Sequence, residues 1–172
     1  MGQPQRKNIR LANWDYAATA YYHVTFCTHE KKKTLGRVIR TEDTDDRAVM
    51  PGQPVESHYA VSLSSLGKAC FDSIMDTAEH YDGFTVDKFV IMPNHIHMLV
   101  KVDEREARAS LGTFVGRVKS GASRAAAALG CGKIEWQRGY YDHIIRGEAD
   151  YVETWKYIDE NPAKWADDEY YA

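Results

Sequence analysis

Two apolar segments near the middle of the chain, separated by a Pro-Asn pair, constrain the fold most strongly. Residues 84–92 are rich in phenylalanine, valine and isoleucine, and this composition favours a β-strand. Pro93 and Asn94 interrupt the segment, after which residues 95–102 alternate between two faces. Because proline and asparagine are common turn residues, the pattern predicts two strands joined as an antiparallel hairpin.

The segments on either side of this hairpin predict the rest of the fold. The alternation at residues 20–28 and the sequence of residues 136–146 indicate two further strands. Residues 64–81 and 111–129 carry apolar side chains at steps of three and four, as amphipathic helices do. The resulting order predicts an α+β fold, a ferredoxin-like β-α-β-β-α-β antiparallel sheet with both helices on one face.

One more helix is expected after the last strand, over residues 151–161. Asp150, with Glu153 three residues later, resembles a capping box. Pro162 ends the helix, because the residue before a proline leaves the helical region. The apolar stripe that docks this helix comprises Tyr151, Trp155 and Ile158. Tyr157 lies off the stripe, so the appended C-terminal helix presents a tyrosine on another face.

Length and composition favour a single cytoplasmic domain. The chain has 172 residues, of which 44% are hydrophobic, and no apolar run is long enough to cross a membrane. Its three scattered cysteines form no C-x-x-C pair, which suits a reducing compartment. We expect a basic N-terminal arm over residues 1–19, one domain over residues 20–166 and an acidic tail at residues 167–172. A solvated loop insertion, able to contain a short hairpin, is expected at residues 29–59.

The net charge of −3 conceals two basic segments. Residues 1–40 carry eight lysines and arginines against two acidic residues, and residues 111–146 carry six against two. Basic side chains that meet on one face can bind a phosphate backbone, although charge alone does not decide whether these segments meet. The candidate DNA-binding residues are Arg117, Lys119 and Arg124 on the expected helix, with Arg6, Lys7 and Arg10 in the N-terminal arm.

His95 and His97 are two residues apart on the second hairpin strand and therefore point to the same side. Ile96 and Met98 point to the other side, where they pack against the two expected helices. The histidines thus lie on the face that these helices leave open, where two imidazoles can chelate a divalent metal. The alternative for a lone His-x-His pair is two solvated surface histidines.

Tyr157 and Asn161 are four residues apart on the last helix, which puts them on one face, one turn apart. The Asn161 amide lies at the helix end, where its oxygen can serve as a metal ligand beside the two histidines. A metal at this position would orient a phosphodiester, and the Tyr157 phenol could then attack the phosphorus. In a chain with eleven tyrosines, packing in the core or on the surface is the alternative for Tyr157.

Three segments, in this order, resemble one family of DNA-processing enzymes. They are MPNHIHMLV at residues 92–100, WQRGYYDHIIR at residues 136–146 and YIDENP at residues 157–162. Together they resemble the single-tyrosine transposases of the HUH (His-hydrophobe-His) nuclease superfamily. The resemblance is greatest to the transposases associated with repetitive extragenic palindromes (REP), and it covers residues 15–166, nearly the whole chain.

The resemblance implies a role for each residue of the constellation. His95 and His97 correspond to the metal ligands of this superfamily, Asn161 to the third ligand and Tyr157 to the catalytic nucleophile. Members cut single-stranded DNA next to hairpins with the help of Mg²⁺ or Mn²⁺, leaving a 5′-phosphotyrosine and a free 3′-OH. Single-stranded or hairpin DNA is therefore the implied partner. Many members are homodimers, in some of which the tyrosine helix serves the partner's histidines, whereas others act as monomers, so the resemblance leaves both a homodimer and a monomer open.

Two other functions and several other residues remain open at this point. A non-catalytic nucleic-acid-binding module could use the same sheet, and a metal-dependent hydrolase could activate water with Asp142 or Glu160 as the base. His143 on the last expected strand is a possible auxiliary ligand. Tyr140 and Tyr141 are rival nucleophiles, although neither has the Asn161 partner one helical turn away.

Overall fold

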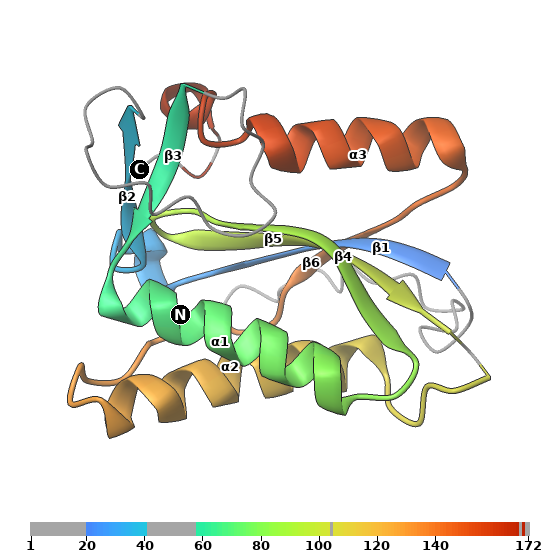
Figure 1. Ribbon diagram of the computed structural model, residues 1–172, viewed down its shortest axis with the longest axis horizontal. Helices are drawn as coiled ribbons and strands as arrows, with labels where there is room; N and C mark the ends of the chain where they lie inside the picture. The colour runs from blue at the N-terminus through green and yellow to red at the C-terminus, as the bar shows by residue number, and fades with distance from the viewer. Residues whose placement is uncertain (1–19, 41–57, 104, 169, 171–172) are drawn as a thin grey trace, which may run out of the picture.

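The computed structural model describes residues 20–40, 58–103, 105–168 and 170 (Figure 1). Within this part of the chain, four strands form one antiparallel sheet in the order β4-β5-β1-β6. The strands are β1 (Ala20–Cys27), β4 (Phe84–Ile91), β5 (His95–Val102) and β6 (Tyr141–Ile144). The helices are α1 (Ser65–His80), α2 (Leu111–Ala128) and α3 (Glu148–Glu160). The ferredoxin-like topology with an appended C-terminal helix is confirmed.

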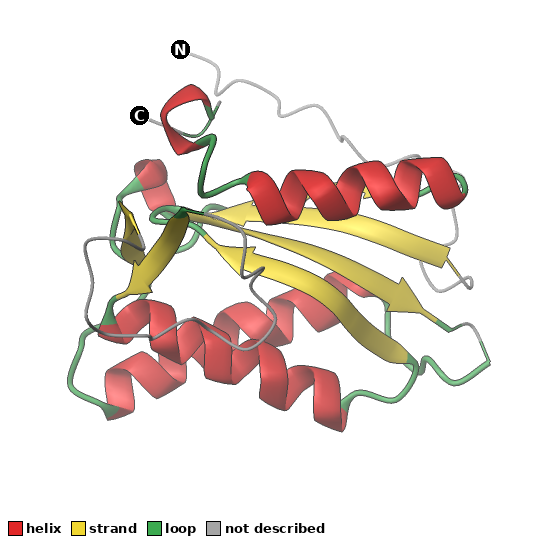
Figure 2. Cartoon of the chain, turned by 45° about the horizontal axis from the view of Figure 1, so that its top comes forward, coloured by secondary structure: helices red, strands yellow, loops and turns green. Residues whose placement is uncertain are grey.

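The sheet lies between two helical layers (Figure 2). Helices α1 and α2 pack on one face, where Ile96 and Met98 of β5 belong to the main core. Helix α3 crosses the other face, where its Ile158 forms a second core cluster with Val90 and Leu99. The face that α1 and α2 leave open is therefore covered by α3, and the residues of β5 are buried on both of their sides.

The segment expected to be a solvated loop contains ordered structure. Strands β2 (Gly36–Arg40) and β3 (Tyr59–Leu63) pair as a two-stranded antiparallel sheet. The side chain of Leu35 in this segment is buried, as is that of Val61 just after it. Between the two strands, the acidic run at residues 42–46 and the turn residues Pro51 and Gly52 lie outside the described residues. The same holds for Arg6, Lys7 and Arg10 of the N-terminal arm.

The last strand is shorter than expected. Trp136 forms an isolated bridge with Thr28, but regular pairing with β1 begins only at Tyr141. Gly139, between them, has a φ of 78°, a left-handed conformation that a continuous strand does not allow. The strand predicted over residues 136–146 is thus divided into a bridge, a turn and β6.

The prediction of a capping box at Asp150 is wrong. Helix α3 begins at Glu148, directly after its N-cap residue Gly147, and so starts earlier than expected. Asp150 instead occupies the third helical position, and its carboxylate accepts a hydrogen bond of 2.8 Å from the backbone N–H of Arg146. The acidic residue therefore satisfies a backbone donor before the helix rather than one within it.

No helix among the described residues is both long and apolar enough to span a bilayer.

Two glycines on different helices provide a test of the packing between α1 and the segment before β2. A Cβ atom added at Gly67 in α1 would collide with the carbonyl oxygen of the buried Leu35, whereas one added at Gly116 in α2 would meet nothing within 4 Å. We expect Gly67→Ala to lower the free energy of unfolding by about 1–3 kcal/mol, because the backbone must move. Gly116→Ala should raise it by about 0.5–1 kcal/mol, because alanine favours the helix.

Urea denaturation of the two variants beside the parent protein measures both changes. Equal effects of the two substitutions would contradict the close contact at Gly67.

Candidate active site

The histidine pair lies at the start of β5, directly after the hairpin turn. The pairing of β1 with β5 puts His97 opposite Thr25 and His95 opposite Cys27. His23, two residues before Thr25, lies on the same face of β1. His95 is 0% exposed and His97 is 1% exposed, so the two residues are not a solvated surface pair.

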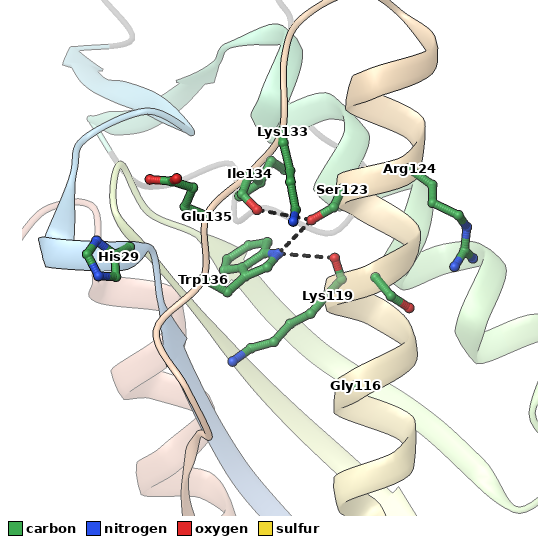
Figure 3. Close-up of a pocket in the computed structure, with 10 residues that line it drawn as sticks. His29, Gly116, Lys119, Ser123, Arg124, Lys133, Ile134, Glu135 and Trp136 are labelled. Atoms are coloured by element: carbon green, nitrogen blue, oxygen red, sulfur yellow. Dashed lines mark hydrogen bonds between the residues drawn. The ribbon is translucent and has the colours of Figure 1, made fainter.

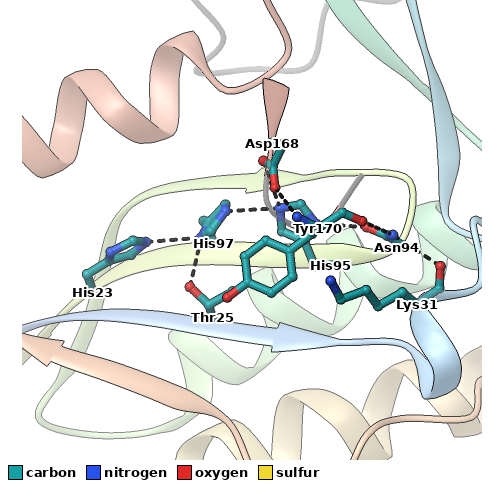
Figure 4. Close-up of polar contacts among 8 residues, drawn as sticks. All are labelled: His23, Thr25, Lys31, Asn94, His95, His97, Asp168 and Tyr170. Carbon is teal, nitrogen blue, oxygen red and sulfur yellow. Dashed lines mark hydrogen bonds and ion pairs between the residues drawn. The ribbon is translucent and has the colours of Figure 1, made fainter. Parts of the chain in front are cut away.

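The side chain of the turn residue Asn94 contacts the His95 ring (Figure 4). Its amide nitrogen donates to the backbone carbonyls of Lys31, at 3.1 Å, and Tyr170, at 2.7 Å. The amide oxygen therefore faces His95 Nδ1 at 2.8 Å and can only accept. His95 consequently carries its proton on Nδ1, and its Nε2 lone pair points to His97 Nε2, 2.9 Å away.

His97 is held from the opposite side of its ring. Its Nδ1 lies 2.8 Å from Thr25 Oγ1 and 3.1 Å from His23 Nε2. With a cation at Nε2, His97 Nδ1 would carry the proton and donate it to these neighbours. Such outer hydrogen bonds orient a metal-binding imidazole and select its tautomer.

Burial keeps these imidazoles neutral. It lowers the pKa of His95 from 6.5 to about 3, and the nearby Lys31 contributes to this lowering. Burial likewise lowers the pKa of His23 to about 4 and holds the pKa of His97 well below 6.5. Neutral imidazole is the form that ligates metal ions, so the group is ready for a cation at neutral pH.

The two histidine donor atoms fit a divalent cation. Two ligands at about 2.1 Å in adjacent octahedral positions are about 3.0 Å apart, close to the separation of the two Nε2 atoms. Asn161, at the end of α3, is 3% exposed, and its Oδ1 has no hydrogen-bond partner within the described part of the chain. A buried, unsatisfied amide oxygen is costly, and a hard cation would satisfy it.

Tyr157 lies beside the histidines of its own chain. Its ring centroid is 5.2 Å from that of His97 and 5.6 Å from that of His23, both in edge-on contacts. The side chain is 40% exposed, so it also reaches the surface. One helix face thus brings a phenol to the edge of a buried imidazole cluster.

Contacts on the opposite face of α3 hold the tyrosine there. Ile158 is fully buried, and Tyr151 and Trp155 pack against the same cluster, as the apolar stripe predicted. The Tyr151 hydroxyl donates to Asp87 at 2.8 Å, and Asp159 pairs with Lys88. These contacts fix the rotation of α3 about its axis and so keep Tyr157 on the side of the histidines.

The other candidate side chains on β6 have different surroundings. His143 lies opposite His23, and its Nε2 donates to the Asp150 carboxylate at 3.0 Å, so this nitrogen is engaged at the start of α3. Asp142 is opposite Val24 on β1 and so projects toward the main core. Tyr141 is 47% exposed.

Two further candidates are held by contacts outside the histidine cluster. Glu160 pairs with Lys164 one turn further along the chain. Tyr140, directly before β6, packs against the main core. Neither residue is therefore placed to act on a phosphodiester at the histidines.

The three basic residues of α2 differ in their exposure and contacts. Arg117 and Arg124 are exposed, as expected for contacts with a phosphate backbone. The Lys119 ammonium instead donates to the backbone carbonyls of Gln137 and Gly139. Burial lowers the pKa of Lys119 to about 8. Lys119 therefore anchors the loop before β6, on the layer opposite α3.

A shallow pocket of about 670 Å³ lies beside this anchor, between α2 and residues 133–136 (Figure 3). Trp136 forms part of its wall and donates from Nε1 to the Lys119 carbonyl and to Ser123 Oγ. Arg124 and Lys133 contribute positive charge to the lining. Neither His95 nor His97 lines the pocket, so it is separate from the histidine cluster.

Sequence patterns alone did not identify three residues of the cluster. The alternation of β1 puts His23 and Thr25 on one face. The pairing of β1 with β5, which the sequence alone does not give, is what brings these two residues beside His97. Asp168 follows the last helix and carries no periodic signal. Its Oδ2 nevertheless lies 3.8 Å from His95 Nε2, within the segment expected to be an acidic tail.

Comparisons of the sequence with known proteins give two matches. A family model described as IS200-like transposase matches residues 16–161. An uncharacterised protein of Haemophilus influenzae is 28% identical over 192 residues, covering 99% of this chain and 95% of its own length.

Solved structures also resemble this chain, among them the following two. One, described as a REP-associated tyrosine transposase bound to a REP hairpin, is 18% identical with a TM-score of 0.55, covering 96% of this chain and 74% of its own. The other, described as a putative transposase of Deinococcus radiodurans, is 15% identical with a TM-score of 0.49, covering 88% of this chain and 95% of its own.

The lowered pKa values of His23 and His95 predict how stability depends on pH. His23 and His95 have lowered pKa values when folded, so below about pH 6.5 the unfolded chain binds more protons than the folded one. The contribution of these two histidines to the free energy of unfolding of metal-free protein should be fully present near pH 7 and fall as the pH decreases toward about 4. Each histidine contributes a slope of up to about 1.4 kcal/mol per pH unit.

Urea denaturation across this pH range gives the profile. His23→Gln should make the decline shallower, whereas His29→Gln, at an exposed position, should leave it unchanged. Identical profiles for the parent protein and His23→Gln would contradict the neutral state of the half-buried His23.

Proposed function

Because the chain belongs to the IS200-like transposase family, we propose that it is a single-stranded DNA endonuclease and strand transferase that acts at hairpin DNA. The observation that supports this activity best is the contact between Tyr157 and His97, whose ring centroids are 5.2 Å apart. A phenol beside neutral imidazoles that can hold a cation suits nucleophilic cleavage of a phosphodiester.

In the proposed reaction, the Tyr157 oxygen attacks the phosphorus of the scissile phosphodiester. A bond forms between Oη and phosphorus, and the bond between phosphorus and the 3′ oxygen breaks. The phenol loses its proton, and the departing 3′ oxygen gains one to become a free 3′-OH. The downstream DNA fragment stays joined to Tyr157 through its 5′ phosphate as a phosphotyrosine, and attack by a 3′-OH reverses these bond changes to rejoin a strand.

We propose that His95, His97 and Asn161 hold Mg²⁺ or Mn²⁺. When bound, the cation supplies Lewis-acid polarisation of the phosphate oxygens. The chain's own contribution is to present the ligands in fixed orientations, because Asn94 holds one imidazole and Thr25 holds the other. Such positioning reduces the reorganisation needed when substrate binds.

Hairpin DNA is the proposed substrate. A protein with a similar fold is described as bound to a REP hairpin, and the three sequence motifs of this chain resemble the same group. Arg117 and Arg124 supply exposed positive charge that suits a phosphate backbone.

Two competing functions receive less support. A module that stacks bases on its open sheet face needs that face to be accessible, and here α3 covers it. A hydrolase that activates water needs a carboxylate beside the cation, and neither Asp142 nor Glu160 provides one. Asp168 lies close enough to His95 to be considered as such a carboxylate. The test between attack by activated water and attack by the tyrosine is therefore whether cleavage requires Tyr157.

We further propose that the active site is formed within one chain. Tyr157 contacts the histidines of its own chain, with α3 docked by Ile158 and Tyr151. A homodimer is compatible with this arrangement but is not required to bring the tyrosine to the histidines.

Replacing the nucleophile tests the proposed reaction. Tyr157→Phe should eliminate the covalent protein–DNA adduct with hairpin-bearing single strands and leave DNA affinity nearly unchanged, because only the phenolic oxygen is lost. Denaturing gels with labelled DNA detect the adduct. Tyr141→Phe, at an exposed position on β6, is the matched control and should form the adduct normally.

An adduct that persists in Tyr157→Phe would contradict the assignment of the nucleophile, and cleavage without any adduct would favour activated water.

Mixing His95→Ala protein with Tyr157→Phe protein tests whether the active site is formed within one chain or between two. A site within one chain predicts no recovery of cleavage, whereas an exchanged helix predicts partial recovery.

The salt dependence of DNA binding tests the exposed arginines of α2. Arg117→Ala and Arg124→Ala should each weaken binding and reduce the slope of log affinity against log salt by about 0.7 for single strands or about 0.9 for duplex stems. Fluorescence anisotropy at several salt concentrations measures this slope. Exposed Lys68 on α1 provides a control, and an unchanged slope in the Arg117/Arg124 double variant would show that this face does not bind DNA.

A further inference from the structure

The segment after α3 returns across the histidine pair (Figure 4). It contains a short 3-10 helix, η3 (Trp165–Asp167), followed by Asp168 and Tyr170. The Tyr170 ring lies 4.5 Å from the His95 ring, and its carbonyl accepts from Asn94. The Asp168 side chain is only 3% exposed. The segment thus forms part of the wall of the site.

We propose that Asp168 is a carboxylate ligand of the divalent cation held by His95 and His97. The inference rests on the metal binding that belongs to the proposed function, and it adds to the donor set a residue that lies beyond the tyrosine helix. The segment after α3 would then be a part of the metal site rather than a tail.

The first support is the convergence of electron pairs. His95 carries its proton on Nδ1, so its Nε2 offers a lone pair toward both His97 Nε2, at 2.9 Å, and Asp168 Oδ2, at 3.8 Å. A proton on His97 can satisfy one of these contacts, but His95 has no proton to offer the carboxylate. One cation among the three atoms could be bound by the lone pairs of all three.

The second support is the geometry of the three donors. The ligand atoms of His95, His97 and Asp168 all lie within 4.8 Å of one another. Two ligands on opposite sides of a cation at about 2.1 Å are about 4.2 Å apart, so closure around the ion requires only a small movement. Oδ1 of Asp168 already accepts from the Tyr170 backbone N–H at 2.7 Å, which directs Oδ2 to the site.

The third support is charge. Mg²⁺ and Mn²⁺ prefer oxygen ligands and are usually bound through one or two carboxylates. Two neutral imidazoles and an amide provide no negative charge, whereas Asp168 provides one at a buried position. A carboxylate there offsets part of the charge of the ion without contact with solvent.

Binding of Mn²⁺ to the full chain without DNA tests the inference. Electron paramagnetic resonance measures free Mn²⁺, and His95→Ala should abolish specific binding. Asp168→Asn, which keeps the shape of the side chain, should weaken Mn²⁺ affinity by about tenfold or more. Asp167→Asn, at the exposed neighbouring position, should bind as the parent protein does.

The outcomes separate the two levels of the proposal. Absence of specific Mn²⁺ binding by the parent protein would overturn the metal-dependent function itself. Parent-like affinity in Asp168→Asn, together with loss in His95→Ala, would overturn only the role of Asp168. Circular dichroism confirms folding, and if Asp168→Asn does not fold, Asp168→Ala is measured in its place under the same criteria.

Discussion

The antiparallel pairing of β5 with β1 is the constraint on which the site depends. Its register puts His97 opposite Thr25 and sends Ile96 to the main core. Since side chains alternate along a strand, a slip of one residue would bury the imidazoles among apolar side chains and turn the core residues toward α3. The same pairing therefore specifies the core and the histidine cluster together.

Sequence patterns were sufficient for the elements whose burial is regular. The alternation of β5 follows from the contact of Ile96 and Met98 with the main core, and the stripe of α3 follows from its contact with the second cluster; both patterns were predicted. Conformations set by one residue were harder to predict. Gly139 interrupts the last strand, and Gly147 takes the N-cap position that Asp150 was expected to fill.

The candidate site was predictable in part for the same reason. His95, His97 and Tyr157 occupy regular positions on a strand and a helix, so their spacing indicated which of them share a face. Their burial was not predictable, because it depends on how α3 and the segment after it return across the sheet. Asp168 lies beside His95 because the segment after α3 folds back over the sheet. The position of Lys119 on its helix could not indicate that its ammonium binds backbone carbonyls of the loop before β6.

The two sides of the site differ in how they are anchored. The histidines belong to a strand that is paired on both edges and packed on both faces, whereas Tyr157 belongs to a helix held by a small cluster and a few polar contacts. Local opening has its lowest free energy where buried contacts are fewest. A DNA end joined to Tyr157 would consequently be attached to the half of the site that is easier to displace, while the half that holds the ion keeps its shape.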